Sequence, residues 1–326
     1  MTEVVVAGID GGASSTTCVV IDSAGRVLGT GRGGPIDHLY KPSGRAQTRR
    51  ALRDALSSAR GARKPRVPLR AVVAGLTGVE PRSNESRTAA RMIRELTRAP
   101  VVHATWDAEI AYFGASVGRP GVMVIAGTGS VAYARNARGQ TTRTGGYGYL
   151  IDDLGGGVKI GQAGLQAALR SADGRAPPTA LLPMLTAQLG GWPKIRARIY
   201  GERGGRAFLA ALVPVVARAA RRGDRVARGI LADAGRELGA LVVAAATRLH
   251  MLHEPFPVFP VGGVFEIGRP VVDPMRAAMR TRARRAVIRP PQFAPEIGAA
   301  LMALELVGIT LDAGALRRLA RSARQL

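Results

Sequence analysis

One pattern occurs twice along this chain and limits the folds open to it: an apolar strand that ends in a glycine turn and is followed by two further strands. The first copy opens with residues 4–10 and turns at Gly11-Gly12. The second opens with residues 122–126 and turns at residues 127–129. Short apolar runs bounded by glycine are typical of buried strands. The repetition predicts a duplicated fold with a cleft between its halves.

Strand and helix patterns alternate along both halves. In the first half we expect strands at 4–10, 17–22, 26–30, 71–76 and 101–104, and helices at 43–60, 87–98 and from 107 onward. In the second half we expect strands at 122–126, 131–135, 140–144, 258–261 and 286–288, with mostly helical sequence from 155 to about 250 and again at the end. This alternation is typical of α/β layers. We predict two domains, residues 1–118 and 119–326, and leave open whether the last helix packs back on the first domain.

The composition is that of a globular chain without disulfides. Its 326 residues suffice for two cores, and 46% of them are hydrophobic. The single cysteine, Cys18, excludes an intramolecular disulfide framework and a cysteine-held metal or iron–sulfur site within one chain. No uncharged apolar run reaches the ~18 residues of a membrane span, and no basic segment precedes the first strand. We expect a cytoplasmic protein without a membrane partner.

The net charge of +24 comes almost wholly from arginine, because only four of the 47 basic residues are lysine. A basic surface can bind nucleic-acid phosphates. The arginines, however, occur along most of the chain, and aromatic residues are only 4%, which leaves no stacking platforms for bases. We interpret the charge as a solvated surface that attracts small anions, and we do not expect a nucleic-acid partner.

The first glycine turn, residues 10–16, has the chemistry of a phosphate site. Its glycines let the backbone approach a phosphate closely, and its hydroxyl and N–H groups supply donors. Asp10, at the end of the strand, can hold the hydration shell of the Mg²⁺ that accompanies ATP. A plain glycine-rich hairpin has the same composition, so this segment by itself leaves both interpretations open.

The second turn, Gly127-Thr128-Gly129-Ser130, also lies between two strands. The spacing Gly127-x-Gly129-x-x-Ala132 formally fits a dinucleotide-binding fingerprint. That fingerprint requires a helix directly after the turn, whereas this chain continues as a strand, so we exclude a Rossmann site. A Walker P-loop is excluded as well, because the chain contains no Gly-x-x-x-x-Gly-Lys.

Asp107 follows a predicted strand and opens a predicted helix. A carboxylate there can cap the helix, which is the commoner case. It can also act as a general base that takes a proton from a substrate hydroxyl, a contribution of about 10²–10⁴-fold. Its place between two phosphate-type turns, at the sheet edge where α/β proteins bind ligands, favours the base.

Two further glycine-rich segments have the composition of ligand loops. Glycines at 145, 146 and 148 precede the adjacent carboxylates Asp152 and Asp153. Such a loop can approach a ligand closely, or it can be a plain flexible connection. Gly262-Gly263-Val264 ends a late strand and can accept an adenine or a ribose against its backbone. His250 and His253 lack a carboxylate partner and are weak candidates for metal binding.

Taken in order, these segments resemble the five signatures of the sugar kinase–actin–Hsp70 superfamily. Residues 10–16 resemble phosphate-1, residues 106–111 connect-1, residues 127–130 phosphate-2, residues 262–265 the adenosine segment and residues 295–300 connect-2. The Gly-Gly-Pro at residues 33–35 and the Gly-Gly-Tyr-Gly at 145–148 are similar to the N-acetylglucosamine kinase branch. That branch also holds the ATPase activators of benzoyl-CoA-type and hydroxyacyl-CoA reductases.

The resemblance implies an α/β fold of two RNase H-like (actin-like ATPase) domains, with ATP and Mg²⁺ as cofactors. It implies phosphorylation of a hydroxyl of an amino sugar, N-acetylglucosamine or glucosamine, or of a related hexose. Asp107 is then the catalytic base, and Asp10 holds Mg²⁺ through water. The implied nucleotide-binding residues are Asp10, Gly11, Gly12, Ser14, Thr16, Gly127, Thr128, Gly129, Ser130, Gly263, and Gly235 with its neighbour Ala234. The implied sugar-binding residues are Asp37, His38, Asp107, Gly146, Tyr147, Gly148 and Asp153.

Three positions depart from the family pattern. Ser15 stands where a basic residue is usual, so a phosphate contact there would be weaker or made differently. Asp37 stands where asparagine is usual and can only accept hydrogen bonds when ionised. Leu154 replaces the glutamate that usually follows the pocket aspartate. An ionised Asp37 favours a protonated amine, which adds free glucosamine to N-acetylglucosamine as a candidate substrate.

Two other functional classes are open to a chain of this family. A reductase activator uses ATP hydrolysis to change conformation, but it bridges a cluster with a cysteine pair from each subunit, and this chain has one cysteine. A non-catalytic nucleotide-binding regulator would explain the charge of +24, yet no helix-turn-helix segment precedes the first strand. Homodimer formation is left open.

Overall fold

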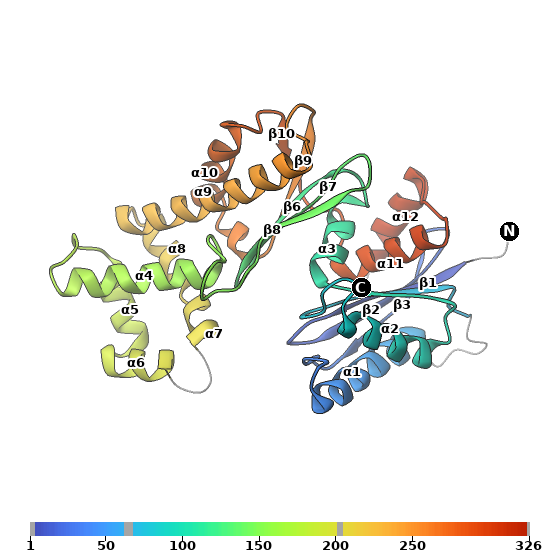
Figure 1. Ribbon diagram of the computed structural model, residues 1–326. Coiled ribbons are helices and arrows are strands. Elements are labelled where there is room, and N and C mark those ends of the chain that lie inside the picture. Colours follow the sequence, from blue (N-terminus) through green and yellow to red (C-terminus); the bar gives the residue numbers. More distant parts are fainter. Residues whose placement is uncertain (1–3, 62–67, 201–204, 325–326) are drawn as a thin grey trace. The chain divides into compact units, whose positions relative to one another are not determined.

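The computed structural model describes residues 4–61, 68–200 and 205–324. The chain forms two compact units, Met1–Arg119 with Pro291–Leu326 and Pro120–Pro290. Each unit is built around a five-stranded sheet (Figure 1). The division differs from the expected one, since residues 291–326 belong to the first unit rather than to the second.

The sheet of the first unit has the order β3-β2-β1-β4-β5. Its strands are β1 (Val5–Gly11), β2 (Thr16–Asp22), β3 (Val27–Gly33), β4 (Ala71–Leu76) and β5 (Val101–Thr105). Its helices are α1 (Pro42–Arg60), α2 (Asn84–Thr97), α3 (Asp107–Ser116), α11 (Pro295–Leu306) and α12 (Ala313–Ala323). Strands β1, β4 and β5 run parallel. Their carboxyl ends therefore lie at one edge of the sheet, where ligands bind in α/β folds.

The second unit repeats this topology with the order β10-β9-β6-β7-β8. Its strands are β6 (Gly121–Ala126), β7 (Ser130–Arg135), β8 (Thr141–Gly145), β9 (Phe256–Val261) and β10 (Ala286–Ile288). Its helices are α4 (Gly157–Ala172), α5 (Leu181–Leu189), α6 (Trp192–Tyr200), α7 (Gly205–Ala210), α8 (Val213–Arg221), α9 (Arg225–Arg248), the 3₁₀ helix η1 (Gly263–Ile267) and α10 (Arg269–Arg280). In both units an antiparallel three-stranded meander is extended by two parallel strands. The predicted duplication is thus present in the strand order.

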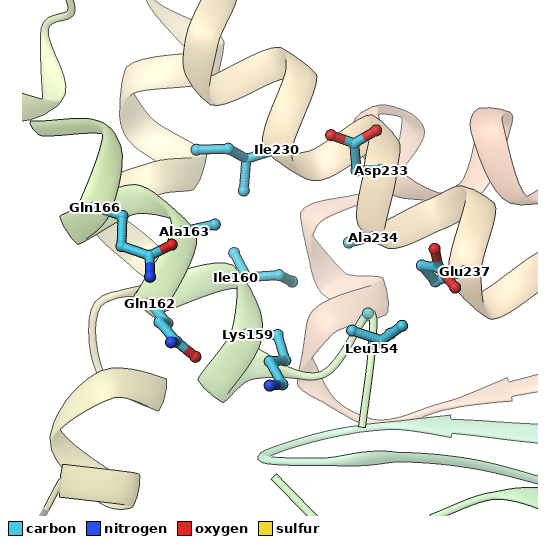
Figure 2. A pocket seen from close by; sticks show the side chains of 11 residues that line it. Leu154, Lys159, Ile160, Gln162, Ala163, Gln166, Ile230, Asp233, Ala234 and Glu237 are labelled. Carbon is cyan, nitrogen blue, oxygen red and sulfur yellow. The ribbon is translucent and has the colours of Figure 1, made fainter. Parts of the chain in front are cut away.

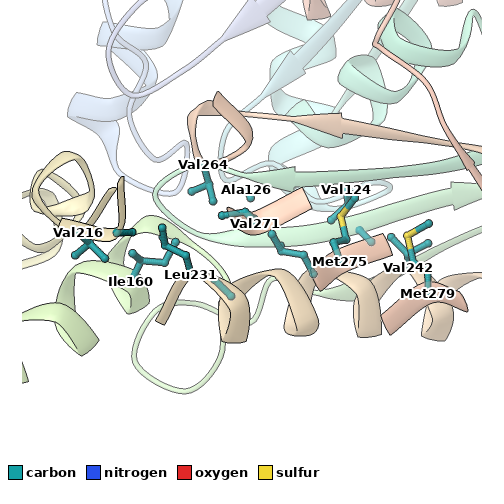
Figure 3. Packing of buried hydrophobic residues seen from close by; sticks show 14 of the residues in the cluster. Val124, Ala126, Ile160, Val216, Leu231, Val242, Val264, Val271, Met275 and Met279 are labelled. Carbon is teal, nitrogen blue, oxygen red and sulfur yellow. The ribbon is translucent and has the colours of Figure 1, made fainter. Parts of the chain in front are cut away.

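The core of the second unit lies between its sheet and helices α4, α8, α9 and α10. Figure 3 shows side chains of β6 in one cluster with those of these helices. Leu231 and Val242 of α9 are fully buried, as are Val271 and Met275 of α10. Each large apolar side chain buried in this way contributes about 1.5–3 kcal/mol to stability. This cluster fixes α4 and α9 relative to the β6–β7 turn.

Helix α11 packs onto β1 with almost no space between the two backbones. A Cβ atom on Gly8 would lie 2.1 Å from the carbonyl oxygen of Glu296 and 2.3 Å from the amide nitrogen of Ala300. Gly298 of α11 lets this helix pack equally closely on α3, since a Cβ there would lie 2.0 Å from the carbonyl oxygen of Ile110. These contacts are the physical reason that the C-terminal segment belongs to the first unit.

Most expected elements are present, with differences at their ends. Strand β3 continues to Gly33 because it pairs with β2 as far as Thr16. Helix α2 starts earlier than expected because the Ser83 hydroxyl oxygen accepts a 3.0 Å hydrogen bond from the amide of Ser86. Cys18 is buried in β2, and this burial raises the pKa of its thiol to about 12. In the part of the chain described, no helix has the length and apolar character of a membrane span.

The approach at Gly8 predicts that Gly8→Ala destabilises the first unit. The added methyl group would meet the backbone of α11, which cannot move like a flexible side chain, so we expect a loss of about 1–3 kcal/mol or more. The measurement is urea unfolding followed by circular dichroism. The matched control is Gly229→Ala in α9, where no atom lies within 4 Å of the added Cβ and alanine stabilises a helix by roughly 0.5–1 kcal/mol. Equal stability of the two variants would contradict the packing argument.

Candidate functional site

The turn between β1 and β2 in the first unit exposes its backbone and its serines. Gly12 closes the turn by donating its N–H to the carbonyl of Ser15 at 2.9 Å. A Cβ on Gly11 would lie 2.5 Å from Cδ2 of Leu76 on the neighbouring strand, so a larger residue there would displace this leucine side chain. Ser14 is exposed, as expected for a phosphate ligand. Thr16 is fully buried and donates its hydroxyl to the carbonyl of Gly34 at 2.9 Å, so the structure gives this side chain a role in holding the turn.

Asp107 is the first residue of α3 and follows β5 after one residue. Its Oδ2 accepts a 2.8 Å hydrogen bond from the hydroxyl of Thr77, which directly follows β4. Because β4 and β5 are adjacent parallel strands, their ends bring these two residues together. The predicted base thus lies at the edge of the sheet that the sequence indicated.

Two neighbouring carboxylates affect Asp10 in the first unit. Burial first, then the charge of Glu296 and then that of Asp107 together raise the pKa of Asp10 to about 7. Glu296 reaches this place because α11 lies on β1. Among the described residues, no three His, Cys, Asp or Glu side chains are grouped so that they could hold a metal ion directly.

The loop after β3 carries the predicted sugar ligands Asp37 and His38 and brings His38 next to the turn after β4. The carboxylate of Asp37 accepts a 2.7 Å hydrogen bond from the amide of His38. A Cβ on Gly78 would lie 3.4 Å from Nδ1 of His38, so this imidazole is next to the turn that carries Thr77. His38 is exposed and stacks on Tyr40 with ring centroids 5.1 Å apart. The first unit therefore places His38 and the predicted base on either side of the residues that follow β4.

In the second unit the turn between β6 and β7 is fastened to the N-terminus of α4. The amides of Gly157 and Val158 donate to the carbonyls of Gly127 and Thr128 at 2.8 and 3.0 Å. A Cβ on Gly127 would meet no atom within 4 Å, which leaves open space beside this turn. A helix N-terminus next to a glycine turn is a favourable environment for phosphate. Ser130 is buried instead, and its hydroxyl donates to the carbonyl of Leu154 at 2.6 Å.

Asp153 has the features of a ligand-binding carboxylate in the second unit. Only 5% of it is exposed, and its backbone has the left-handed φ of 59° that is costly for residues other than glycine. No side-chain hydrogen bond to this carboxylate occurs among the residues the structure describes. A Cβ on Gly129 would lie 2.3 Å from Oδ2 of Asp153, so the carboxylate packs on the phosphate-type turn. The left-handed backbone at residue 153 is the kind of strain that clusters at functional sites.

The predicted sugar loop between β8 and α4 depends on glycine. Gly145, Gly146 and Gly148 all have positive φ, between 71° and 99°. Tyr147 is 62% exposed, and the guanidinium of Arg143 lies 5.6 Å from its ring centroid. The amide of Tyr147 donates to Oδ2 of Asp152 at 3.3 Å. The Asp152 carboxylate therefore stabilises the loop, whereas the neighbouring Asp153 is buried in the second unit.

The predicted adenosine segment lies beside the β6–β7 turn. A Cβ on Gly262 would lie 2.5 Å from the carbonyl oxygen of Ala126, the last residue of β6. A Cβ on Gly263 would meet no atom within 4 Å. The two segments that the sequence assigned to phosphate and to adenosine thus adjoin, with open space next to both. The contact of these segments with a nucleotide remains a prediction.

The pair Ala234-Gly235 lies on α9. A Cβ on Gly235 would lie 2.2 Å from the carbonyl oxygen of Val271, so this glycine allows α9 and α10 to pack closely. Ala234 lines a hollow of about 350 Å³ between α4 and α9 (Figure 2). Leu154 and Lys159 line the same hollow. The predicted contact of Gly235 with a nucleotide remains a prediction, and the structure supplies a packing reason for the residue.

A comparison with protein-family models matches residues 7–303 to the BadF/BadG/BcrA/BcrD ATPase family. The chain belongs to this family. It is 32% identical over 266 residues to the N-acetylmuramic acid/N-acetylglucosamine kinase of Clostridium acetobutylicum, a match that covers 79% of this chain and 85% of that one. It is 26% identical over 328 residues to the N-acetyl-D-glucosamine kinase of Dictyostelium discoideum, with 93% and 99% covered.

A solved structure confirms the fold of this family member. A candidate N-acetylglucosamine kinase from Chromobacterium violaceum superimposes with a TM-score of 0.69 and 28% identity, covering 92% of this chain and 98% of that one. The two mixed five-stranded sheets with their helices are therefore the actin-like ATPase fold that the sequence predicted.

Three residues near the predicted site had no role in the sequence analysis. Thr77 contacts Asp107, and Glu296 raises the pKa of Asp10. Lys159 lies in the first turn of α4, close in sequence to the amides that hold the Gly127 turn. Their positions at a strand end and in the first turns of helices were the signal available in the sequence. The sequence did not show which strand ends are neighbours.

The raised pKa of Asp10 predicts that the unliganded family member loses stability as pH rises. The unfolded chain releases this proton near pH 3.8, whereas the folded protein keeps it up to about pH 7. Because the folded state binds more protons between these values, the free energy of unfolding falls across the interval, by at most ~4 kcal/mol at ~1.4 kcal/mol per unit of pKa. The contribution is complete below the lower pKa and lost as pH passes the upper one.

The measurement is the urea midpoint in EDTA at about pH 5 and about pH 8, on either side of the folded pKa. Asp10→Asn cannot titrate, so its midpoint should fall less over the same interval. Equal falls in the variant and the natural protein would show that Asp10 does not hold this proton.

Proposed function

We propose that this chain is an ATP-dependent sugar kinase that transfers the γ-phosphate of ATP to a hydroxyl of an amino sugar, N-acetylglucosamine or glucosamine, or of a related hexose. Family membership and the identity to two amino-sugar kinases support the reaction class. One structural observation carries the proposal. In the second unit Asp153, which is 5% exposed, packs with its carboxylate on Gly129 of the glycine turn. A sugar bound by Asp153 would therefore lie next to a phosphate bound by the turn.

The residues of the second unit hold the two substrates side by side. The turn at residues 127–130 offers backbone N–H groups and the Thr128 hydroxyl to phosphate oxygens. Asp153 accepts hydrogen bonds from sugar hydroxyls, and Gly146 and Gly148 let the Tyr147 loop follow the sugar ring. Such positioning of two reactants supplies a large part of the acceleration in phosphoryl transfer.

The first unit supplies the acid–base chemistry. Asp107 accepts the proton of the acceptor hydroxyl, which makes the sugar oxygen a stronger nucleophile. Thr77 bonds to Oδ2 of Asp107, which leaves Oδ1 for that proton. His38 lies near the turn that carries Thr77, and His38 and the neighbouring Asp37 would contact the sugar. The exposed Ser14 in the β1–β2 turn donates to phosphate.

The residues present fit a magnesium nucleotide. Asp10 would hold Mg²⁺ through water, and the open space beside Gly127 and Gly263 would take the nucleotide. When bound, Mg²⁺ neutralises the charge that develops on the transferred phosphoryl group. The reductase-activator alternative is disfavoured, because the only cysteine is buried in β2 and its pKa is raised to about 12.

Replacement of the base tests the proposal. We expect Asp107→Asn to lower kcat by about 10²–10⁴-fold, since the amide cannot accept the hydroxyl proton. Binding of ATP, measured by calorimetry, should remain. Turnover is measured by coupled ADP release over a panel of sugars. Asp54→Asn, a surface carboxyl on α1, is the matched control. A natural protein with no sugar-stimulated turnover would refute the kinase, and near-normal activity of Asp107→Asn would refute only the role of this residue.

Replacement of Asp37 tests which amino sugar the protein prefers. If Asp37 binds the protonated amine of glucosamine, Asp37→Asn should lower kcat/KM for glucosamine about 10-fold or more relative to N-acetylglucosamine, the scale of a hydrogen bond to a charged group. The asparagine keeps the size and the acceptor oxygen of the residue. An unchanged ratio of the two kcat/KM values would place the amine elsewhere.

A further inference from the structure

Thr77 contacts two parts of the first unit at once. Its side chain hydroxyl donates to Oδ2 of Asp107 at 2.8 Å. Its amide donates to the carbonyl of Gly11, in the β1–β2 turn, at 2.9 Å. The residue directly follows β4, the strand that lies between β1 and β5. Its backbone is thus fixed to one candidate ligand turn while its side chain fixes the orientation of the predicted base.

The contribution of this hydrogen bond to folding is small. The Thr77 side chain is exposed, and water replaces its hydroxyl readily when the bond is broken. Its effect on Asp107 is larger, because the terminal torsion of an aspartate is broad and a carboxylate without a fixed partner rotates. A donor on Oδ2 selects one orientation and directs Oδ1 away from Thr77.

A second threonine makes the comparison possible. Thr105 ends β5 and donates its hydroxyl to Oε2 of Glu109 at 2.6 Å. Thr77 directly follows β4, and Thr105 ends the parallel strand β5. Each donates a hydrogen bond to one carboxylate in the first turn of α3. Only Thr77 holds the carboxylate predicted to be the base. The pair therefore separates an effect on Asp107 from a general effect on this end of the sheet.

We propose that Thr77 is a positioning residue for phosphoryl transfer, an inference that rests on the proposed kinase function. The hydroxyl of Thr77 holds Oδ2 of Asp107, so that Oδ1 faces the acceptor hydroxyl. In the step, the O–H bond of the sugar breaks and its proton passes to Oδ1. The sugar oxygen forms a bond to the γ-phosphorus as the bond between that phosphorus and ADP breaks. Thr77 keeps its own proton throughout.

The experiment compares Thr77→Val, Thr77→Ser and Thr105→Val, with N-acetylglucosamine and glucosamine as acceptors. Valine keeps the shape of threonine and loses the donor, whereas serine keeps the donor. We expect Thr77→Val to lower kcat roughly 10- to 100-fold, with KM for ATP and for the sugar changed by less than about threefold. Thr77→Ser should recover most of kcat. Thr105→Val should retain kcat, and the melting temperature of Thr77→Val should match that of the natural protein.

Several results would overturn the inference. A normal kcat for Thr77→Val would do so, as would an equal loss in Thr77→Ser, because the donor would then have no role. An equal loss in Thr105→Val would assign the effect to the strand ends as a whole. These results leave sugar phosphorylation by the natural protein intact. Absence of sugar-dependent turnover in the natural protein would overturn the proposed function and this inference together.

Discussion

The contact of α11 with β1 determines the chemistry of the first unit. Gly8 lets the two backbones approach until no Cβ fits between them. Glu296, the second residue of α11, is then close enough to Asp10 for its negative charge to raise the pKa of that carboxyl group. The same helix approaches α3 through Gly298, and α3 carries Asp107. One packing constraint thus holds three carboxylates near the ends of parallel strands. This arrangement lowers stability, because Asp10 is buried and lies near two other negative charges. A fold selected for stability alone would avoid it.

In the second unit, backbone conformation determines where the predicted ligand groups lie. The turn at Gly127 is tied to the amides that open α4, so its shape depends on that helix. Asp153 then takes a left-handed conformation that places its carboxylate against Gly129. A larger residue at 129 would displace Asp153, and a relaxed backbone at 153 would turn its side chain away. The predicted phosphate turn and the predicted sugar ligand are therefore coupled through one close contact.

The sequence predicted the strands, the glycine turns and the place of Asp107 between a strand and a helix, because these follow from local patterns. The roles of Asp107 and Asp153 stay predictions, and that of Asp153 rests on the family resemblance. The sequence did not predict Thr77 or Glu296. Their roles depend on which strand ends are neighbours and on a helix almost 290 residues further along the chain than β1. Side-chain orientation was also beyond local patterns. Thr16 and Ser130 have hydroxyls suited to phosphate, yet both donate to carbonyls inside their own unit.

Within the described part of the chain, Asp10, Asp107 and Glu296 of the first unit lack the arginine partners that other carboxylates of this chain have. With a net charge of +24 the chain has ample guanidinium groups to neutralise any acidic residue. Arginines pair with carboxylates elsewhere, as Arg49 does with Glu95 and Arg276 with Asp273. Among the described residues, no ion pair involves Asp10, Asp107 or Glu296. Unpaired and partly buried carboxylates are costly in any protein, and most readily tolerated where a bound cation or a proton transfer requires them. In this arginine-rich chain, Asp10, Asp107 and Glu296 therefore differ from the surface carboxylates that pair with a guanidinium group.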